Sequence, residues 1–402
     1  MNSEWKNLRL GSFCDVIAGG TPPRSNSAYY GGSIPWVKIS DMLQGEIFDT
    51  DEKITAEALA NCNTKLLPEG TILLSIFATI GRTAVLRVPA TTNQAIVGII
   101  PRKDDIDKLY FRHFLDAASV SLASKGRGVA QNNINSSILR DIEIPIPHKN
   151  GKPDLSEQKR IAAILDKADA IRRKLQQSLR LSDDFLRSVF LDMFGDPVTN
   201  PKGWPVEPLS EGVESFDGGK NVNPCDTDRR DGMRVLKVSA VTSGEYLDSE
   251  SKSFGEDFIV PTDYIVKPGD LLISRANTAE LVGAVAYVWN TSGQAMLPDK
   301  LWRFVWSKPA KIHPLFMLHM ARTGHFRKQL ILRATGSSGS MKNIGKVKML
   351  EIPIPLPPIS LQNKFAAVVN QTQAKIQKST AFLQDAETLF STLQQRAFRG
   401  EL

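Results

Sequence analysis

The chain has 402 residues, 42% of them hydrophobic and 23% charged, a balance that is typical of a globular protein with two or three domains and excludes collagen-like, disordered and membrane-spanning classes. Lysine and arginine outnumber aspartate and glutamate by 50 to 43, and the net charge of +7 favours an anionic partner. Three cysteines imply no disulfide framework, and the first residues carry charges where a signal peptide has its apolar core, so we expect a cytoplasmic protein.

Residues 1–153 are predicted to form a mixed domain of strands and helices. Short β-branched runs at 34–39, 71–77 and 95–100 are broken by Gly, Pro, Asn and Asp, which is typical of strands joined by turns. A helix is expected at 109–124.

Residues 154–196 are predicted to form one long helix. Apolar residues recur at three- and four-residue spacing from Ile161 onward, Ser156 is the expected N-cap, and Gly195 is the expected stop signal. The pattern continues for more than four heptads. It therefore favours a coiled-coil seam on a helix ~50 Å long.

The rest of the chain repeats this arrangement about 200 residues later, in the same order. Val37-Lys38-Ile39-Ser40 returns as Leu236-Lys237-Val238-Ser239, and the Ile-Pro-Ile-Pro run at 144–147 returns at 352–355. We predict a second mixed domain at 197–358 and a second helical region at 359–402. The second domain should have strands at 234–238, 270–274 and 283–288 and a helix at 314–332. The expected fold class is α+β (mixed α/β), with two similar globular domains.

The two long helices are predicted to pair as an antiparallel coiled coil, because each carries an apolar stripe and a pseudo-two-fold axis would relate the two halves. The alternative is that each helix packs only on its own globular domain, which makes the stripe harder to bury. The expected seam residues are Ile161, Leu165, Leu175, Leu179, Leu186, Phe365, Val369, Ile376, Leu383 and Phe390.

Basic segments with polar loops favour a nucleic-acid partner. Residues 300–350 contain eleven lysines and arginines and no acidic residue, and Gly-rich loops at 126–133 and 336–343 occupy the same place in both halves. Lys and Arg neutralise phosphates, Asn and Gln can bind adenine edges, and Arg can bind guanine edges. The alternative is a solvated basic helix followed by a flexible loop.

The sequence contains no clear catalytic or metal-binding motif. The run 200–204, Asn-Pro-Lys-Gly-Trp, lacks the second Pro and the adjacent aromatic residue of an amino-methyltransferase loop, and there is no Gly-Lys-Ser/Thr phosphate loop. Pro153-Asp154 with Glu157 and Lys159 is crowded at a helix start, unlike a nuclease site, and the five histidines lack metal-ligand spacing. We expect neither an enzyme site nor a metal site.

Several motifs resemble the specificity subunits of type I restriction–modification systems. They are Gly19-Gly20-Thr21-Pro22, the segment 30–41, the strand 269–274, Glu157-Gln158-Lys159-Arg160-Ile161-Ala162, and Phe194-Gly195-Asp196-Pro197 followed by 200–204. The resemblance covers both halves of the chain. The second half departs from the pattern at 218–221 and 233–236, where the Gly-Thr-Pro and Ile-Pro-Trp elements are replaced.

This resemblance implies that each mixed domain is a target-recognition domain for one half of a split double-stranded DNA sequence. The helical regions would dock two methyltransferase subunits that modify adenine, and a restriction/motor subunit would join the assembly. The chain itself would be non-catalytic and bind no cofactor, with S-adenosylmethionine, ATP and Mg expected on the partner subunits. The candidate DNA contacts are Thr21, Arg24, Lys38, Ser40, Arg82, Arg127, Gln131, Asn132, Asn133, Lys220, Lys237, Arg275, Lys300, Arg327, Ser338, Lys342 and Asn343.

Two other hypotheses remain open. One is a coiled-coil scaffold that binds only proteins, in which the basic loops are incidental. The other is a fused restriction–modification enzyme whose catalytic site is not recognised in the sequence.

Overall fold

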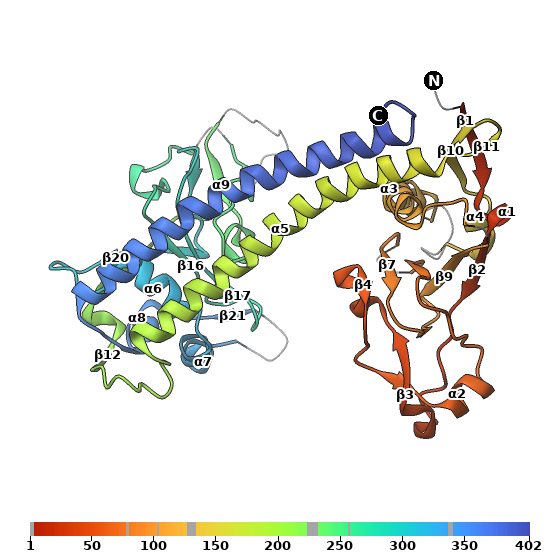
Figure 1. Cartoon of the computed structure of the whole chain (residues 1–402). Coiled ribbons are helices and arrows are strands. Elements are labelled where there is room, and N and C mark those ends of the chain that lie inside the picture. The colour runs from red at the N-terminus through yellow and green to blue at the C-terminus, as the bar shows by residue number, and fades with distance from the viewer. Residues whose placement is uncertain are drawn as a thin grey trace. The chain divides into compact units, whose positions relative to one another are not determined.

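The structure is a computed structural model that describes residues 4–77, 80–102, 104–126, 134–222, 232–255, 258–336 and 341–402. The chain divides into two units: unit 1 contains residues 1–176 and 380–402, and unit 2 contains residues 177–379. Unit 2 is thus inserted in the sequence of unit 1. Two long helices, α5 (Leu155–Phe194) and α9 (Ile359–Ala397), each contribute to both units (Figure 1).

The described residues of unit 1 form three sheets. The first contains β1 (Glu4–Arg9), β10 (Glu143–Lys149) and β11 (Lys152–Pro153). The second has the order β2 (Cys14–Ala18), β9 (Ile96–Pro101), β6 (Ile72–Ser75), β7 (Thr83–Leu86) and β4 (Glu46–Ile47). The third has the order β5 (Lys53–Ile54), β3 (Tyr30–Val37) and β8 (Thr91–Thr92). The strands predicted at 34–39, 71–77 and 95–100 correspond to β3, β6 and β9.

Unit 2 repeats this plan. β12 (Val206–Pro208) pairs with β22 (Pro353–Pro355). A four-stranded sheet has the order β13 (Val213–Gly218), β20 (Leu301–Trp306), β16 (Leu271–Ser274) and β18 (Val285–Tyr287). Another has the order β15 (Ser251–Ser253), β14 (Arg234–Leu236) and β19 (Ala295–Met296), and β17 (Ala276–Asn277) pairs with β21 (Lys342–Asn343). The mixed fold and the internal repeat are therefore confirmed.

The shorter helices follow the sequence signals with one exception. Unit 1 contains α1 (Leu10–Phe13), α2 (Ala56–Asn61), α3 (Lys108–Gly126) and α4 (Ser136–Arg140), and α3 is the helix predicted at 109–124. The single helix predicted at 314–332 is wrong. It is two helices, α6 (Pro314–Ala321) and α7 (Gly324–Arg333), followed by α8 (Lys346–Leu350). The break occurs because the Thr323 side chain accepts a hydrogen bond from the Phe326 amide and so starts a new helix.

α5 ends where the sequence predicts, but it begins with a different cap. The carboxylate of Asp154, not the hydroxyl of Ser156, accepts hydrogen bonds from the amides of Ser156 and Glu157, at 3.1 and 3.2 Å. The negative charge of this carboxylate is also stabilised by the positive end of the helix dipole. At the other end, Gly195 has a φ of 79°, which glycine adopts without strain, and its amide donates to the carbonyl of Leu191. No helix in the described part of the chain is both long and apolar enough to cross a membrane.

The long helices pack on the globular cores and on each other within each unit. In unit 1, Ile161 and Leu165 share a buried core with Phe390, and Gln176 donates a hydrogen bond to Glu387. In unit 2, Leu186 shares a core with Phe365 and Val369. The helix segments in unit 1 are antiparallel, because Arg160 contacts Leu402 whereas Gln176 contacts Glu387. The remaining expected seam residues are only half-buried: Leu175, Leu179, Ile376 and Leu383.

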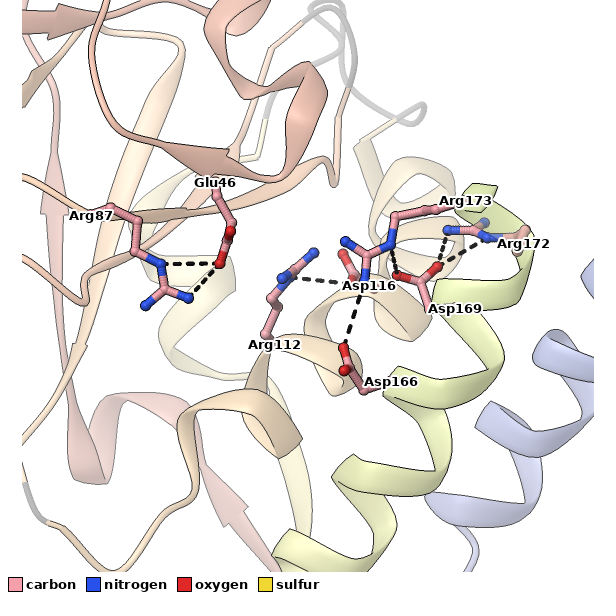
Figure 2. Close-up of polar contacts among 8 residues, drawn as sticks. All are labelled: Glu46, Arg87, Arg112, Asp116, Asp166, Asp169, Arg172 and Arg173. Atoms are coloured by element: carbon pink, nitrogen blue, oxygen red, sulfur yellow. Dashed lines mark hydrogen bonds and ion pairs between the residues drawn. The ribbon is translucent and has the colours of Figure 1, made fainter. Parts of the chain in front are cut away.

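A charged cluster lies where α3 approaches α5 in unit 1 (Figure 2). On α5, Asp169 accepts from Arg172 at 2.5 Å and from Arg173 at 3.1 Å, and Arg173 also reaches Asp166 at 3.7 Å. On α3, Asp116 is half-buried and accepts a hydrogen bond from the hydroxyl of Thr83 at 2.5 Å. Desolvation raises the pKa of Asp116. The four arginines and four carboxylates drawn in Figure 2 form a partly buried polar region.

An aromatic cluster holds the long helices in unit 2. Phe194 of α5 packs against Phe316 of α6 with ring centroids 4.9 Å apart and against Phe365 of α9 at 5.4 Å. Phe190 stacks on Phe316 at 5.8 Å and on the ring of His319 at 6.2 Å. Unit 1 has an equivalent contact, in which Phe398 packs against Tyr110 and Phe114 of α3 with ring centroids 5.4 and 5.3 Å apart.

A buried glutamine at the start of each long helix is common to both units. The side chain of Gln158 accepts a hydrogen bond from the amide of Asp107 at 2.8 Å and donates to the carbonyl of Asp105 at 3.2 Å. Gln362 likewise accepts from the amide of His313 at 2.8 Å and donates to the carbonyl of Lys311 at 3.0 Å. Each glutamine thus ties the loop before α3 or α6 to the long helix.

His113 makes unit 1 sensitive to acid. Its side chain is buried on α3, neither ring nitrogen has a hydrogen-bond partner in the described structure, and burial, aided by Arg112, lowers its pKa to about 4. In an unfolded chain the pKa of histidine is about 6.5. The unfolded state therefore binds a proton between these values that the folded state does not, so the free energy of unfolding falls as the pH drops from about 6.5 towards about 4.

His113→Leu should reduce the dependence of stability on pH. This substitution removes the titrating group and two unpartnered nitrogens, so urea unfolding measured between pH 4.5 and 7 should give a flatter profile than the wild-type chain. Identical slopes would show that other groups control the acid sensitivity.

Candidate nucleic-acid interface

Two predicted contact residues of unit 1 meet at one carboxylate. Glu52 accepts from Nη1 of Arg24 and from Nζ of Lys38, both at 2.8 Å. The guanidinium carbon of Arg24 also lies 4.5 Å from the ring centroid of Tyr30 and 5.2 Å from that of Trp36. The hydrogen bond from Arg24, and then that from Lys38, lowers the pKa of Glu52, so the group is ionised at neutral pH and holds both cations in place.

The loop that carries Arg24 is fixed by tight backbone packing. The indole Nε1 of Trp36 donates to the carbonyl of Gly20 at 3.0 Å, and the hydroxyl of Thr21 donates to the side chain of Gln94. A Cβ on Gly20 would lie 2.8 Å from the amide nitrogen of Thr64. Gly219, which corresponds to Gly20 in the repeat, is equally constrained, because a Cβ there would lie 1.6 Å from the carbonyl oxygen of Leu297. Only glycine fits at these two positions.

An ion pair recurs at the corresponding turn of unit 2. Lys237 precedes the short helix η4 (Val238–Val241), just as Lys38 precedes η2 (Ile39–Gln44), and its ammonium lies 3.9 Å from a carboxylate oxygen of Glu250. Glu250 also accepts from the hydroxyl of Ser239 at 2.6 Å. Both units therefore present a lysine held by a glutamate from a later segment of the chain.

The most extensive cluster of predicted contacts surrounds Arg275 in unit 2. Arg275 donates from Nη1 to the side-chain oxygen of Asn343 at 2.9 Å and from Nε to the backbone oxygen of Asp299 at 2.7 Å. Its guanidinium lies 5.5 Å from the ring centroid of Trp302, and the ammonium of Lys346 lies 5.7 Å from the same ring. These residues come together because β17 and β21 pair beside the end of β20.

The other candidates lie apart from these clusters. Ser40 is exposed in η2, and Arg82 is half-buried between β6 and β7. Lys220 is exposed, with its ammonium 5.9 Å from the ring of Phe258, and Lys342 donates to the carbonyl of Gly336 at 2.9 Å. The carbonyl of Lys300 accepts from the amide of Arg275, and Arg327 donates to the backbone of Glu280. The candidates outside the described residues are Arg127, Gln131, Asn132, Asn133 and Ser338.

Sequence reasoning missed the carboxylates and one aromatic ring that hold these cations. Glu52 and Asp299 are distant in sequence from their partners Arg24 and Arg275. The sequence around Trp302 is typical of a core strand and gives no sign of a contact with a cation. The repeat does contain one usable signal, since Glu52 and Glu250 both follow the paired Gly-Glu turns at 45–46 and 244–245. Among the described residues, no group of three or more His, Cys, Asp and Glu side chains is arranged to hold a metal ion.

Comparison with known proteins gives consistent matches. The family model described as the type I restriction modification DNA specificity domain matches residues 2–181. The chain is 28% identical over 237 residues to the specificity subunit of the type I restriction enzyme MjaIX from Methanocaldococcus jannaschii, covering 54% of this chain and 53% of that protein. It is 32% identical over 183 residues to a type I restriction enzyme specificity subunit from Escherichia coli, covering 44% and 43%. These matches span about half the length of the two relatives.

A solved structure extends the similarity in fold to the whole chain. The crystal structure of a type I restriction–modification S subunit from M. genitalium superimposes with a TM-score of 0.59 at 14% sequence identity, covering 99% of this chain and 96% of that one. At this level of identity the match shows a shared fold.

Proposed function

We propose that the chain is a specificity subunit of a type I restriction–modification system, which recognises a bipartite sequence in double-stranded DNA and directs modification and restriction subunits to it. The proposal is supported by the family model that matches residues 2–181 and by the similar relatives and fold. Residues 1–153 and 197–358 would each recognise one half of the sequence, and the helical regions 154–196 and 359–402 would join them. The observation that carries the proposal is the duplicated unit, in which each copy presents cations held beside aromatic rings.

In this proposal the chain performs no chemistry on DNA. It would bind two methyltransferase subunits, which modify adenine, and a restriction/motor subunit, and S-adenosylmethionine, ATP and Mg would be bound by those partners in the cytoplasm. The role of this chain is to orient donors and cations towards the DNA. Phosphate contacts would fix its position, and side chains that reach base edges would select the sequence.

The direct test is to express the chain with its methyltransferase partner and map adenine methylation across a bacterial genome. We expect methylation at one bipartite sequence with a fixed gap, and none with either protein alone. Methyl transfer by the isolated chain would contradict a non-catalytic subunit. Failure of the complex to bind DNA in a mobility-shift assay would favour a protein scaffold.

Lys342→Ala should weaken DNA binding for all sequences alike. The ammonium of Lys342 lies beside the Gly-rich loop of an acid-free segment, and the loss of one phosphate contact should reduce the slope of log binding constant against log salt by about one unit. Binding isotherms at several salt concentrations measure this slope. Lys364→Ala is the matched control, since Lys364 is exposed on α9, and it should keep the wild-type slope. An unchanged slope in a folded Lys342→Ala protein would place the phosphate contacts elsewhere.

A further inference from the structure

Asn343 is fixed by its backbone in a short ribbon of unit 2. It lies in β21, opposite Ala276 of the antiparallel strand β17. On its other side, its amide donates to the carbonyl of Thr335 at 2.8 Å, and its carbonyl accepts from the amide of Thr335 at 2.7 Å. Both backbone polar groups of Asn343 are therefore committed, and only its exposed side chain is free to meet a ligand.

The side chain of Asn343 is itself oriented by Arg275. Nη1 of Arg275 donates to Oδ1 of Asn343 at 2.9 Å. Arg275 cannot easily turn away, because its Nε donates to the backbone of Asp299, its Nη2 lies 3.4 Å from the Asp299 carboxylate, and its guanidinium lies over Trp302. With Oδ1 held by a cation, the amide of Asn343 has one preferred orientation, with Nδ2 directed away from Arg275.

Within the described residues, Nδ2 of Asn343 has no partner, and it is a hydrogen-bond donor. A two-stranded antiparallel ribbon is an element that the DNA major groove admits. The ribbon also carries Lys342, which can neutralise phosphate beside the groove. The side chain of Asn343 therefore offers its Nδ2 donor to a ligand, while its Oδ1 acceptor faces Arg275.

We propose, on the basis of the function proposed above, that Asn343 is a specificity-determining residue of unit 2 and that Arg275 is its positioning residue. Asn343 donates from Nδ2 to an acceptor on a base edge in the major groove. Guanine (N7 and O6) and thymine (O4) are the bases favoured, because adenine places an amino donor beside its N7 acceptor. The adenine contact of asparagine pairs Nδ2 with N7 and Oδ1 with the N6 amino group, and here the bond from Arg275 holds Oδ1 on the side away from the outward Nδ2.

This arrangement belongs to only one half of the repeat. The amide of Ile344 donates to the carbonyl of Arg275, and in unit 1 the amide of Ile134 donates in the same way to the carbonyl of Ile76. Ile76 therefore occupies the place of Arg275, and its side chain cannot orient an asparagine amide by hydrogen bonding. The inference thus concerns the half of the DNA sequence recognised by unit 2.

Asn343→Asp tests the proposal, because the new side chain has the same shape and can still accept from Arg275. The outward donor then becomes an acceptor. In the complete methyltransferase complex, we expect methylation of wild-type sites to fall about tenfold or more, and one position of the second half-site to change its preference from guanine or thymine to a base with an amino group, cytosine or adenine. The first half-site and the gap should not change. Genome-wide mapping of methylated adenines reports all three quantities.

Arg275→Ala tests the positioning role separately. The amide of Asn343 is then free to rotate, so the same position should become degenerate while the other positions stay specific, and Arg275→Lys, which retains one donor group, should restore part of the preference. Asn290→Asp is the matched control, because Asn290 is exposed after β18 and introduces the same charge change outside the cluster. It should give the wild-type sequence.

Three results would overturn the inference. The first is an unchanged base preference in a folded Asn343→Asp complex. The second is a loss of methylation by Asn343→Asp that is equal at all sequences, which would indicate a phosphate contact. The third is an equal loss at all sequences in Arg275→Ala, with no position becoming degenerate. If the wild-type complex itself methylates no bipartite sequence, the proposed function fails, and this inference fails with it.

Discussion

Inserting seven residues after Gln176 in α5 and seven after Ser379 in α9 is expected to lengthen the gap between the two half-sites by about three base pairs. Seven residues lengthen a helix by about 10.5 Å and rotate its face by only ~20°, and successive base pairs are about 3.4 Å apart. Both helices must be extended, because α5 and α9 each contribute to unit 1 and to unit 2. The gap is measured by mapping methylated adenines in cells that carry the partner subunit.

An insertion into α5 alone is the control for this prediction. It would shift α5 against α9 by two helical turns in one of the two units. The buried contacts of that unit would then be lost, which are those of Ile161 and Leu165 with the core of Phe390, or that of Leu186 with the core of Phe365. We expect that variant to unfold at lower temperature and to methylate no sequence. An unchanged gap in a folded double-insertion variant would mean that the helices do not set the distance between the half-sites.

Phe194→Ala is expected to lower the free energy of unfolding of unit 2 by ~3–5 kcal/mol. The Phe194 side chain is 4% exposed and lies against two other phenylalanine rings, so its removal leaves a cavity that α5, α6 and α9 cannot easily close. Hydrogen exchange should show the largest loss of protection in residues 177–194 and 314–321, and denaturant unfolding should give the magnitude.

Phe382→Ala is the matched control for Phe194→Ala. Phe382 is the same residue type on α9, but its side chain is 62% exposed, and its removal should change stability by less than ~1 kcal/mol. Equal effects of the two substitutions would contradict the idea that the aromatic cluster holds the long helices on unit 2.

The organisation of the fold could be predicted because the sequence contains it twice. Apolar periodicity placed α5 and α9, and the glycine at 195 marked the end of α5. Local capping was less predictable. Asp154 and Ser156 are both good caps by residue type, and only the geometry of the entering chain decides between them. Thr323 breaks a helix that its apolar neighbours would continue, because its side chain competes for the backbone amides.

The candidate interface was predictable only in part. The cations Arg24, Lys38 and Arg275 stand out in a basic sequence, but their carboxylate partners do not. Arg24 and Glu52 meet because β3 and β5 pair. Arg275 and Asp299 meet because Arg275 follows β16, Asp299 precedes β20, and these two strands pair. Such contacts depend on tertiary register, which composition and spacing do not encode. The orientation of the Asn343 amide is likewise a property of the folded cluster and not of the residue type.

The insertion of unit 2 within unit 1 determines the order in which the two units can be completed during synthesis. The core of unit 1 includes Phe390 and Ala397, so it stays open after residue 176 has been made. At the usual rate of ~5–20 residues per second, about 10–40 s pass before residue 380 follows. Unit 2 has all of its residues by then and can fold first, although it is encoded second. For that interval, Tyr110 and Phe114 on α3 lack the ring of Phe398 that covers them in the folded chain, so apolar surface that favours aggregation is exposed.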